Sequence, residues 1–179
     1  LEIENMIINT LPVNHTVPCI AFSFDIKRAR KFSVVKAEEN SIPKHLWNRL
    51  QKGETITHEE KLFVPEMVLG EERRGIKLSY CTDTRPTDEL YDFVRESDLL
   101  ICEGMYGDDA ELEKAEQNRH MLFSEAARIA RDSTSKELWL THFSPALSEP
   151  EEYLDRTKEI FTNTVLGQDR LMRTMDFGG

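Results

Sequence analysis

The stretch that decides the fold is "GIKLSYCTDTRPTDELYDFVRESDLLICEG", residues 75–104. Its first ten residues are a short, largely apolar run that ends in Thr82-Asp83-Thr84, and this run is typical of a buried strand. The middle part, from Pro86 to Ser97, places its apolar residues at helical spacing, and a second apolar run follows at residues 98–104. The stretch therefore predicts a strand, a helix and a second strand in succession.

The same alternation continues toward the end of the chain. Residues 109–132 are predicted to be helical with an interruption near 118–120, and "KELWLTHFSP" at 136–145 is predicted to be a strand. "SEPEEYLDRTKEIF" at 148–161 predicts a helix, in which Ser148 and Glu151 have the spacing of a capping box. Three strands alternating with three helices predict a layered α/β domain.

The first 74 residues divide into two parts. Residues 3–24 are rich in Ile, Val and Phe and are predicted to be extended. Residues 25–74 are more polar, and they include a short predicted helix after Pro43 and the basic run "KRARKFSVVK" at 27–36. This run is either a solvated hairpin tip or a basic patch. We interpret 25–74 as an inserted arm, and 1–24 with 75–179 as the main domain.

The composition limits the classes of protein that fit. The net charge of −10 disfavours a broad nucleic-acid footprint. No apolar run reaches the roughly 18 residues of a membrane span, and the start "LEIENMIINT" has neither the basic segment of a signal peptide nor an initial Met. Three cysteines without metal-type spacing favour a reducing cytoplasm. We therefore expect part of a longer cytoplasmic protein that does not enter a membrane.

Each of the three predicted strands ends on a chemically capable residue, namely Asp83, Glu103 and His142. Ligands of α/β sheets gather beyond the carboxyl ends of the strands. His15 lies where two extended runs meet, and His120 lies at a predicted helix start. Histidines with a carboxylate suit a transition metal such as zinc.

Simpler explanations exist for these residues. A lone Asp before a helix is more often an N-cap, a role that Thr84 or Thr87 could fill instead. A lone His at a strand end is more often structural. A serine hydrolase built on Ser144 lacks the Gly-x-Ser-x-Gly elbow. From residue types and spacing alone, the chain is an α/β domain that suits a metal-dependent hydrolase.

Four motifs, "YCTDTRP", "SDLLICEGMY", "RHMLFSEAARIA" and "LWLTHFSP", are similar in order and spacing to the C-terminal half of ribonuclease Z. These are the tRNA 3′-processing endonucleases of the metallo-β-lactamase superfamily. The resemblance implies an αββα sandwich with two zinc ions, or manganese, and a tRNA precursor as substrate. It also implies that 25–74 is an exosite arm that grips the tRNA.

The resemblance assigns roles to residues of this chain. His15 and His142 would each bind one metal ion, and Asp83 would bridge the two ions. His120 would lie near the scissile phosphate as a catalytic residue, and Glu103 would support it. The His-x-His-x-Asp-His loop of the family is absent from this chain, so the resemblance implies a missing N-terminal half and an inactive fragment.

Some positions differ from the family pattern. Met121 and Leu122 replace Ser-Thr, Ala146 replaces an Arg, and the arm lacks a Gly-Pro tip. These differences keep two alternatives open, namely a hydrolase of a small phosphodiester or ester, and a non-catalytic binding domain of the same fold. Half of a two-sheet sandwich would expose its inner apolar face, so we also expect a homodimer or association with the missing half.

Overall fold

The computed structural model describes residues 1–178 and divides into two compact units. One unit contains residues 1–27 together with the chain from 75 onward, and the other contains residues 28–74. The second unit has its own small core, in which Ala37, Leu46, Leu50, Phe63 and Val68 are buried. Each unit is therefore described by itself.

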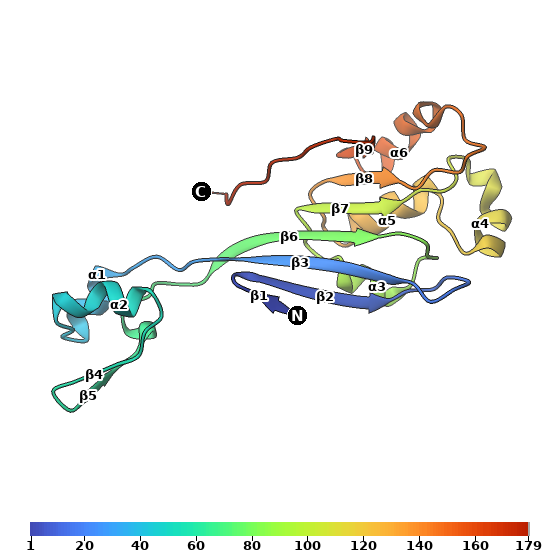
Figure 1. Cartoon of the computed structure of the whole chain (residues 1–179). Helices are drawn as coiled ribbons and strands as arrows, with labels where there is room; N and C mark the ends of the chain where they lie inside the picture. The colour runs from blue at the N-terminus through green and yellow to red at the C-terminus, as the bar shows by residue number, and fades with distance from the viewer. Residues whose placement is uncertain (179) are drawn as a thin grey trace. The chain divides into compact units, whose positions relative to one another are not determined.

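Among the described residues of the larger unit, seven strands form one sheet in the order β1-β2-β3-β6-β7-β8-β9 (Figure 1). The β1-β2-β3 part is antiparallel, and β6-β7-β8-β9 is parallel. The strands are β1 (Glu2–Ile3), β2 (Met6–Pro12), β3 (Ile20–Arg28), β6 (Arg73–Cys81), β7 (Leu99–Glu103), β8 (Leu138–Thr141) and β9 (Thr164–Leu166).

Helices cover one face of this sheet (Figure 1). Leu100, Leu138 and Leu140 from the parallel strands are fully buried, and so are Phe123 and Ile129 of α5. Burying one such side chain stabilises the fold by about 1.5–3 kcal/mol. The helices of this unit are α3 (Asp88–Phe93), η3 (Asp109–Glu111), α4 (Leu112–Asn118), α5 (Phe123–Asp132), η4 (Pro150–Tyr153) and α6 (Leu154–Ile160).

The opposite face of the sheet is apolar and partly exposed. Along β3, Ala21 packs in the helix-covered core, so the alternation of a strand turns Phe22 and Phe24 to the other side. Ile20, Tyr80 and Val165 are exposed by 46%, 40% and 36%. We call the side chains of Ile20, Phe22, Phe24, Tyr80, Ile101 and Val165 the open face.

The smaller unit corrects one sequence-based interpretation. The basic run at 27–36 is not a hairpin tip, because β3 ends at Arg28 and helix α1 begins at Val34. Ser33 caps α1 by accepting a hydrogen bond from the Lys36 backbone N–H. The other elements are α1 (Val34–Glu39), η1 (Lys44–Leu46), α2 (Trp47–Gln51), β4 (Ile56–His58), β5 (Lys61–Phe63) and η2 (Pro65–Met67).

A second correction concerns the capping box predicted for Ser148 and Glu151. The helical segment begins at Pro150, and its N-cap, Glu149, makes no side-chain capping bond. Proline at the first position fixes the start of the segment without needing a capped N–H. Within residues 1–178, no helix is long and apolar enough to span a bilayer.

Thr87 is the cap that starts helix α3. Its side chain accepts a hydrogen bond from the Leu90 backbone N–H at 3.3 Å. We predict that Thr87→Ala lowers the free energy of unfolding by about 1 kcal/mol, the usual worth of such a cap. Urea denaturation measures this, with the exposed Thr162→Ala as the matched control. Equal midpoints for both variants would contradict the capping role.

Candidate metal centre

Three candidate residues meet at one edge of the sheet because their strands are parallel and in register. Cys81 pairs with Cys102, and Glu103 pairs with Thr141. Asp83 therefore follows β6, Glu103 ends β7, and His142 follows β8, all at the carboxyl edge. The arrangement predicted from the strand ends is present.

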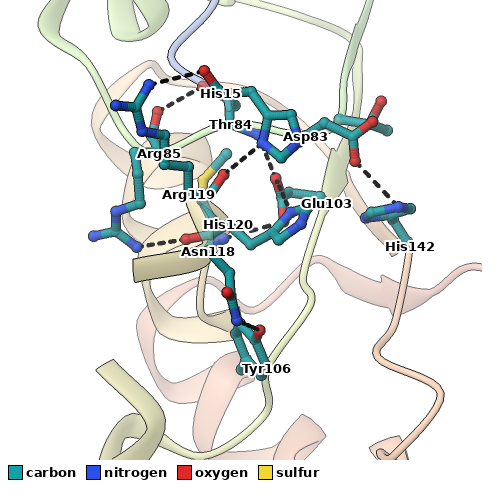
Figure 2. A network of polar contacts seen from close by, with 12 residues as sticks. His15, Asp83, Thr84, Arg85, Glu103, Tyr106, Asn118, Arg119, His120 and His142 are labelled. Atoms are coloured by element: carbon teal, nitrogen blue, oxygen red, sulfur yellow. Dashed lines mark hydrogen bonds and ion pairs between the residues drawn. The ribbon is translucent and has the colours of Figure 1, made fainter. Parts of the chain in front are cut away.

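Asp83 and His142 have left-handed backbone conformations, which are uncommon for residues other than glycine. Their φ angles are +53° and +58°, in the left-handed region. Such a residue costs about 1–3 kcal/mol unless the surroundings hold it, and such residues cluster at functional sites. His142 Nε2 lies 3.1 Å from Asp83 Oδ1 (Figure 2). The two strained turns thus bring a nitrogen and an oxygen ligand together.

Glu103 is the buried centre of the polar network. Its side chain is 0% exposed and accepts hydrogen bonds from the backbone N–H groups of Thr84 at 2.5 Å and Met121 at 3.0 Å. His120 Nδ1 lies 3.0 and 3.2 Å from its two oxygens. Burial raises the pKa of Glu103 to about 7, and the two backbone donors act against that rise. Glu103 therefore joins the turn after β6 to the turn before α5.

His120 lies in the turn between α4 and α5, three residues before α5 begins at Phe123, so it does not occupy the helix start that was predicted for it. Because its Nδ1 contacts Glu103, its Nε2 remains available to a metal or a substrate. Its ring centroid lies 4.9 Å from that of His15 and 5.3 Å from that of His142. Burial lowers the pKa of His120, and His15 lowers it further. Both effects favour the neutral imidazole.

His15 reaches this site from the loop between β2 and β3. Its Nδ1 lies 3.1 Å from the Arg119 carbonyl oxygen, and Arg119 Nη1 donates to the His15 carbonyl at 2.9 Å (Figure 2). Arg119 also has a left-handed φ of +57°. All five predicted site residues are therefore brought together by segments that are distant in sequence.

The donor set fits a transition metal. Ligand atoms of His15, Asp83 and His120 lie within 4.8 Å of one another, and so do those of Glu103, His120 and His142. Imidazole nitrogen and carboxylate oxygen are ligands that zinc accepts. Glu103 already accepts several hydrogen bonds, so it suits a supporting role better than a ligand role. His120 belongs to both groups, so it is a candidate ligand as well as a candidate catalytic residue.

Sequence reasoning missed several residues that build the site. Thr84 does not cap α3 but accepts from the Asn14 N–H and donates to the Arg85 carbonyl. The Leu122 backbone N–H donates to Glu125 Oε2 at 2.9 Å. No local pattern marks the contact between Asn14 and Thr84, which are 70 residues apart, whereas Glu125 lies only three residues after Leu122. Ser144 Oγ accepts from the Ala146 N–H, which gives no support to a serine nucleophile.

Comparison with curated proteins finds relatives along almost the whole of this chain. The chain is 56% identical to ribonuclease Z of Clostridium acetobutylicum over 98% of its own length and 57% of that protein. It is 54% identical to ribonuclease Z of Clostridium kluyveri over 95% of this chain and 56% of the relative. The chain is homologous to part of ribonuclease Z. It spans just over half the length of these curated ribonuclease Z relatives.

Solved structures identify the fold. The metallo-β-lactamase fold protein YhfI from Bacillus subtilis matches 93% of this chain and 47% of its own, with a TM-score of 0.57 and 20% identity. The short form of human tRNase Z matches 96% of this chain and 44% of its own, with a TM-score of 0.54 and 19% identity. No protein-family model matches the sequence. The chain thus has part of the metallo-β-lactamase fold, as the ribonuclease Z resemblance implied.

Proposed function

We propose that the chain is part of a metal-dependent endoribonuclease that removes 3′ trailers from tRNA precursors. The observation that carries this proposal is the meeting of His15, Asp83, His120 and His142 above the buried Glu103. The 56% identity to a ribonuclease Z supports the choice of substrate. Zinc is the metal that we propose, as a pair of ions, with manganese as the alternative.

In the proposed mechanism, some residues of this chain would bind the metal ions and others would position or transfer a proton. Asp83 would hold both ions through its carboxylate, and His15 and His142 would each hold one through an imidazole nitrogen. When bound, the ions would supply Lewis-acid chemistry at the phosphate and activate a water as the nucleophile. Glu103 orients His120 through Nδ1, so that Nε2, once protonated, is the atom that would give a proton to the leaving oxygen.

We further propose that the complete site needs a partner segment. Zinc sites take three or four protein ligands per ion, and His15, Asp83 and His142 are too few for two ions. An N-terminal half of a longer chain would supply the remaining ligands, and residues 1–179 alone would be inactive. The free thiols of Cys19, Cys81 and Cys102 support a reducing, cytoplasmic location.

Residues 28–74 are proposed as the arm that grips the tRNA. Its basic run is partly committed to the fold, because Arg30 donates to the Gly70 carbonyl and Lys36 to the Leu69 carbonyl. Two other groups suit RNA: Lys44 Nζ lies 5.8 Å from the Trp47 ring, and the rings of His45 and His58 are 5.2 Å apart. The engaged basic side chains, with Ala146 in place of an Arg, favour the second candidate function, a small-phosphodiester hydrolase.

The arm allows an experiment that separates the two functions. In the full-length protein, residues 31–72 are replaced by a short Gly/Ser linker, and cleavage of a 3′-extended tRNA precursor is compared with that of bis(p-nitrophenyl) phosphate. The tRNA function predicts that precursor cleavage falls at least about tenfold while diester cleavage is unchanged. Intact protein that cleaves the diester but not the precursor would favour the second function.

The open face predicts association of the isolated chain. Residues 1–179 are expected to sediment as a homodimer, because dimerisation would cover Phe22, Phe24 and Tyr80. The double variant Phe22→Gln/Tyr80→Gln is expected to weaken the dimer. The control is Leu62→Gln, which changes a side chain that is 61% exposed in the arm. A monomer with cooperative melting would contradict this prediction.

A further inference from the structure

Arg85 forms a largely buried ion pair with Glu125 next to the candidate metal centre. Its Nη1 lies 2.7 Å from Glu125 Oε2, and its Nη2 lies 2.5 Å from Glu125 Oε1. The two side chains are only 15% and 12% exposed. This bidentate geometry fixes the guanidinium plane against the first turn of α5.

The same pair holds the turn that carries His120. Arg85 Nη1 also donates to the His120 carbonyl oxygen at 2.6 Å, as Figure 2 shows. Glu125 Oε2 accepts the Leu122 backbone N–H at 2.9 Å. The backbone on both sides of Met121 is therefore tied to one ion pair, while the His120 ring stays free to contact Glu103.

The backbone of Arg85 holds a second loop of the site. Its N–H donates to the Asn14 carbonyl at 3.0 Å, and the Asn14 N–H donates to Thr84 Oγ1 at 3.1 Å. Asn14 directly precedes His15, and Thr84 directly follows Asp83. Arg85 thus joins three segments that each carry a candidate metal ligand.

We infer that Arg85, with Glu125, is a positioning residue that sets His15 and His120 at their places beside Asp83. This inference rests on the proposed metal-dependent function. A buried ion pair is a weak source of stability, since apolar side chains of similar size often serve as well. The guanidinium adds fixed geometry. Two of its N–H groups bind the Glu125 carboxylate in one plane, and a third N–H binds the His120 carbonyl. Replacing both members of the pair by apolar side chains should therefore alter the metal site more than the stability of the fold.

The test uses four variants of the full-length protein: Arg85→Met, Arg85→Lys, the double variant Arg85→Met/Glu125→Leu, and the control Arg131→Met. Arg131 lies in the same helix as Glu125, is 52% exposed and pairs with Asp132 away from the site. Zn²⁺ affinity is measured by competition with a chromogenic chelator. Unfolding of the metal-free proteins is measured in urea.

Arg85→Met is expected to weaken Zn²⁺ binding about 10- to 100-fold, as other changes to groups that orient metal ligands do. The double variant should regain most of the unfolding midpoint, because no charge is left buried alone, but its Zn²⁺ affinity should stay low. Arg85→Lys should not restore affinity, because an ammonium lacks the fork. Arg131→Met should bind like the wild type.

Three results would overturn the positioning role. They are wild-type affinity in Arg85→Met or Arg85→Lys, recovery of affinity together with stability in the double variant, and an equal loss in Arg131→Met. If the double variant does not fold, the Zn²⁺ affinity of Arg85→Lys tests the positioning role instead. A wild-type protein without Zn²⁺ affinity would contradict the proposed function itself, so the two failures are distinguishable.

Discussion

Asp83→Ala in the full-length protein should lower the rate of metal-dependent phosphodiester cleavage by about a thousandfold or more. A metal ion stabilises transition-state charge by several kcal/mol, and each 1.36 kcal/mol is a factor of ten in rate. Asp83 belongs to the group with His15 and His120 and lies 3.1 Å from His142 Nε2. Losing it would therefore disturb every candidate ligand.

Asp83→Asn is the matched variant. Asparagine tolerates the left-handed φ of +53° and keeps the size of the side chain, but it cannot bridge two cations as a carboxylate does. Cleavage of bis(p-nitrophenyl) phosphate is the measurement, and Asp92→Ala, which removes an exposed partner of Arg95, is the control. Turnover by Asp83→Ala within a few-fold of the wild type would contradict the bridging role.

Glu103→Ala should destabilise the metal-free protein by about 3–5 kcal/mol. The change leaves the backbone N–H groups of Thr84 and Met121 buried without acceptors, at about 1–3 kcal/mol each, and it opens a cavity. The His120 ring would also lose the partner of its Nδ1. Urea denaturation of the full-length protein measures the loss.

The control is Glu111→Ala, which breaks an exposed pair with Lys114 that should contribute at most about 1 kcal/mol. Glu103→Gln keeps the size and one acceptor oxygen, so its destabilisation should be smaller than that of Glu103→Ala. A loss below about 1 kcal/mol in Glu103→Ala would show that the network is not what holds the two turns.

The sequence was sufficient for the parts of the site that follow from strand order. Asp83, Glu103 and His142 could be placed together because each follows an apolar run and parallel strands end at one edge. His15 lies between antiparallel strands, outside this repeat; its place where two extended runs meet suggested a ligand, and the family resemblance then assigned it to one metal ion. Strand order thus identified Asp83, Glu103 and His142, and the family motifs added the role of His15.

Contacts between side chains and backbone could not be predicted in this way. The bond from Arg85 to the His120 carbonyl joins residues 35 apart, and no periodicity encodes it. The capping box failed because Pro150 starts its segment without a cap, and the hairpin tip failed because Ser33 caps a helix. Local patterns of this kind fix the structure only where contacts from the rest of the fold do not favour another conformation.

Metal analysis of the full-length protein tests the central claim most directly. After dialysis against buffer without chelator, the wild-type protein should retain about two zinc or manganese ions per chain, and Asp83→Ala should retain fewer. The predicted difference follows from the ligand atoms of His15, Asp83 and His120 lying within 4.8 Å of one another. Less than one tightly bound ion per wild-type chain would contradict the account.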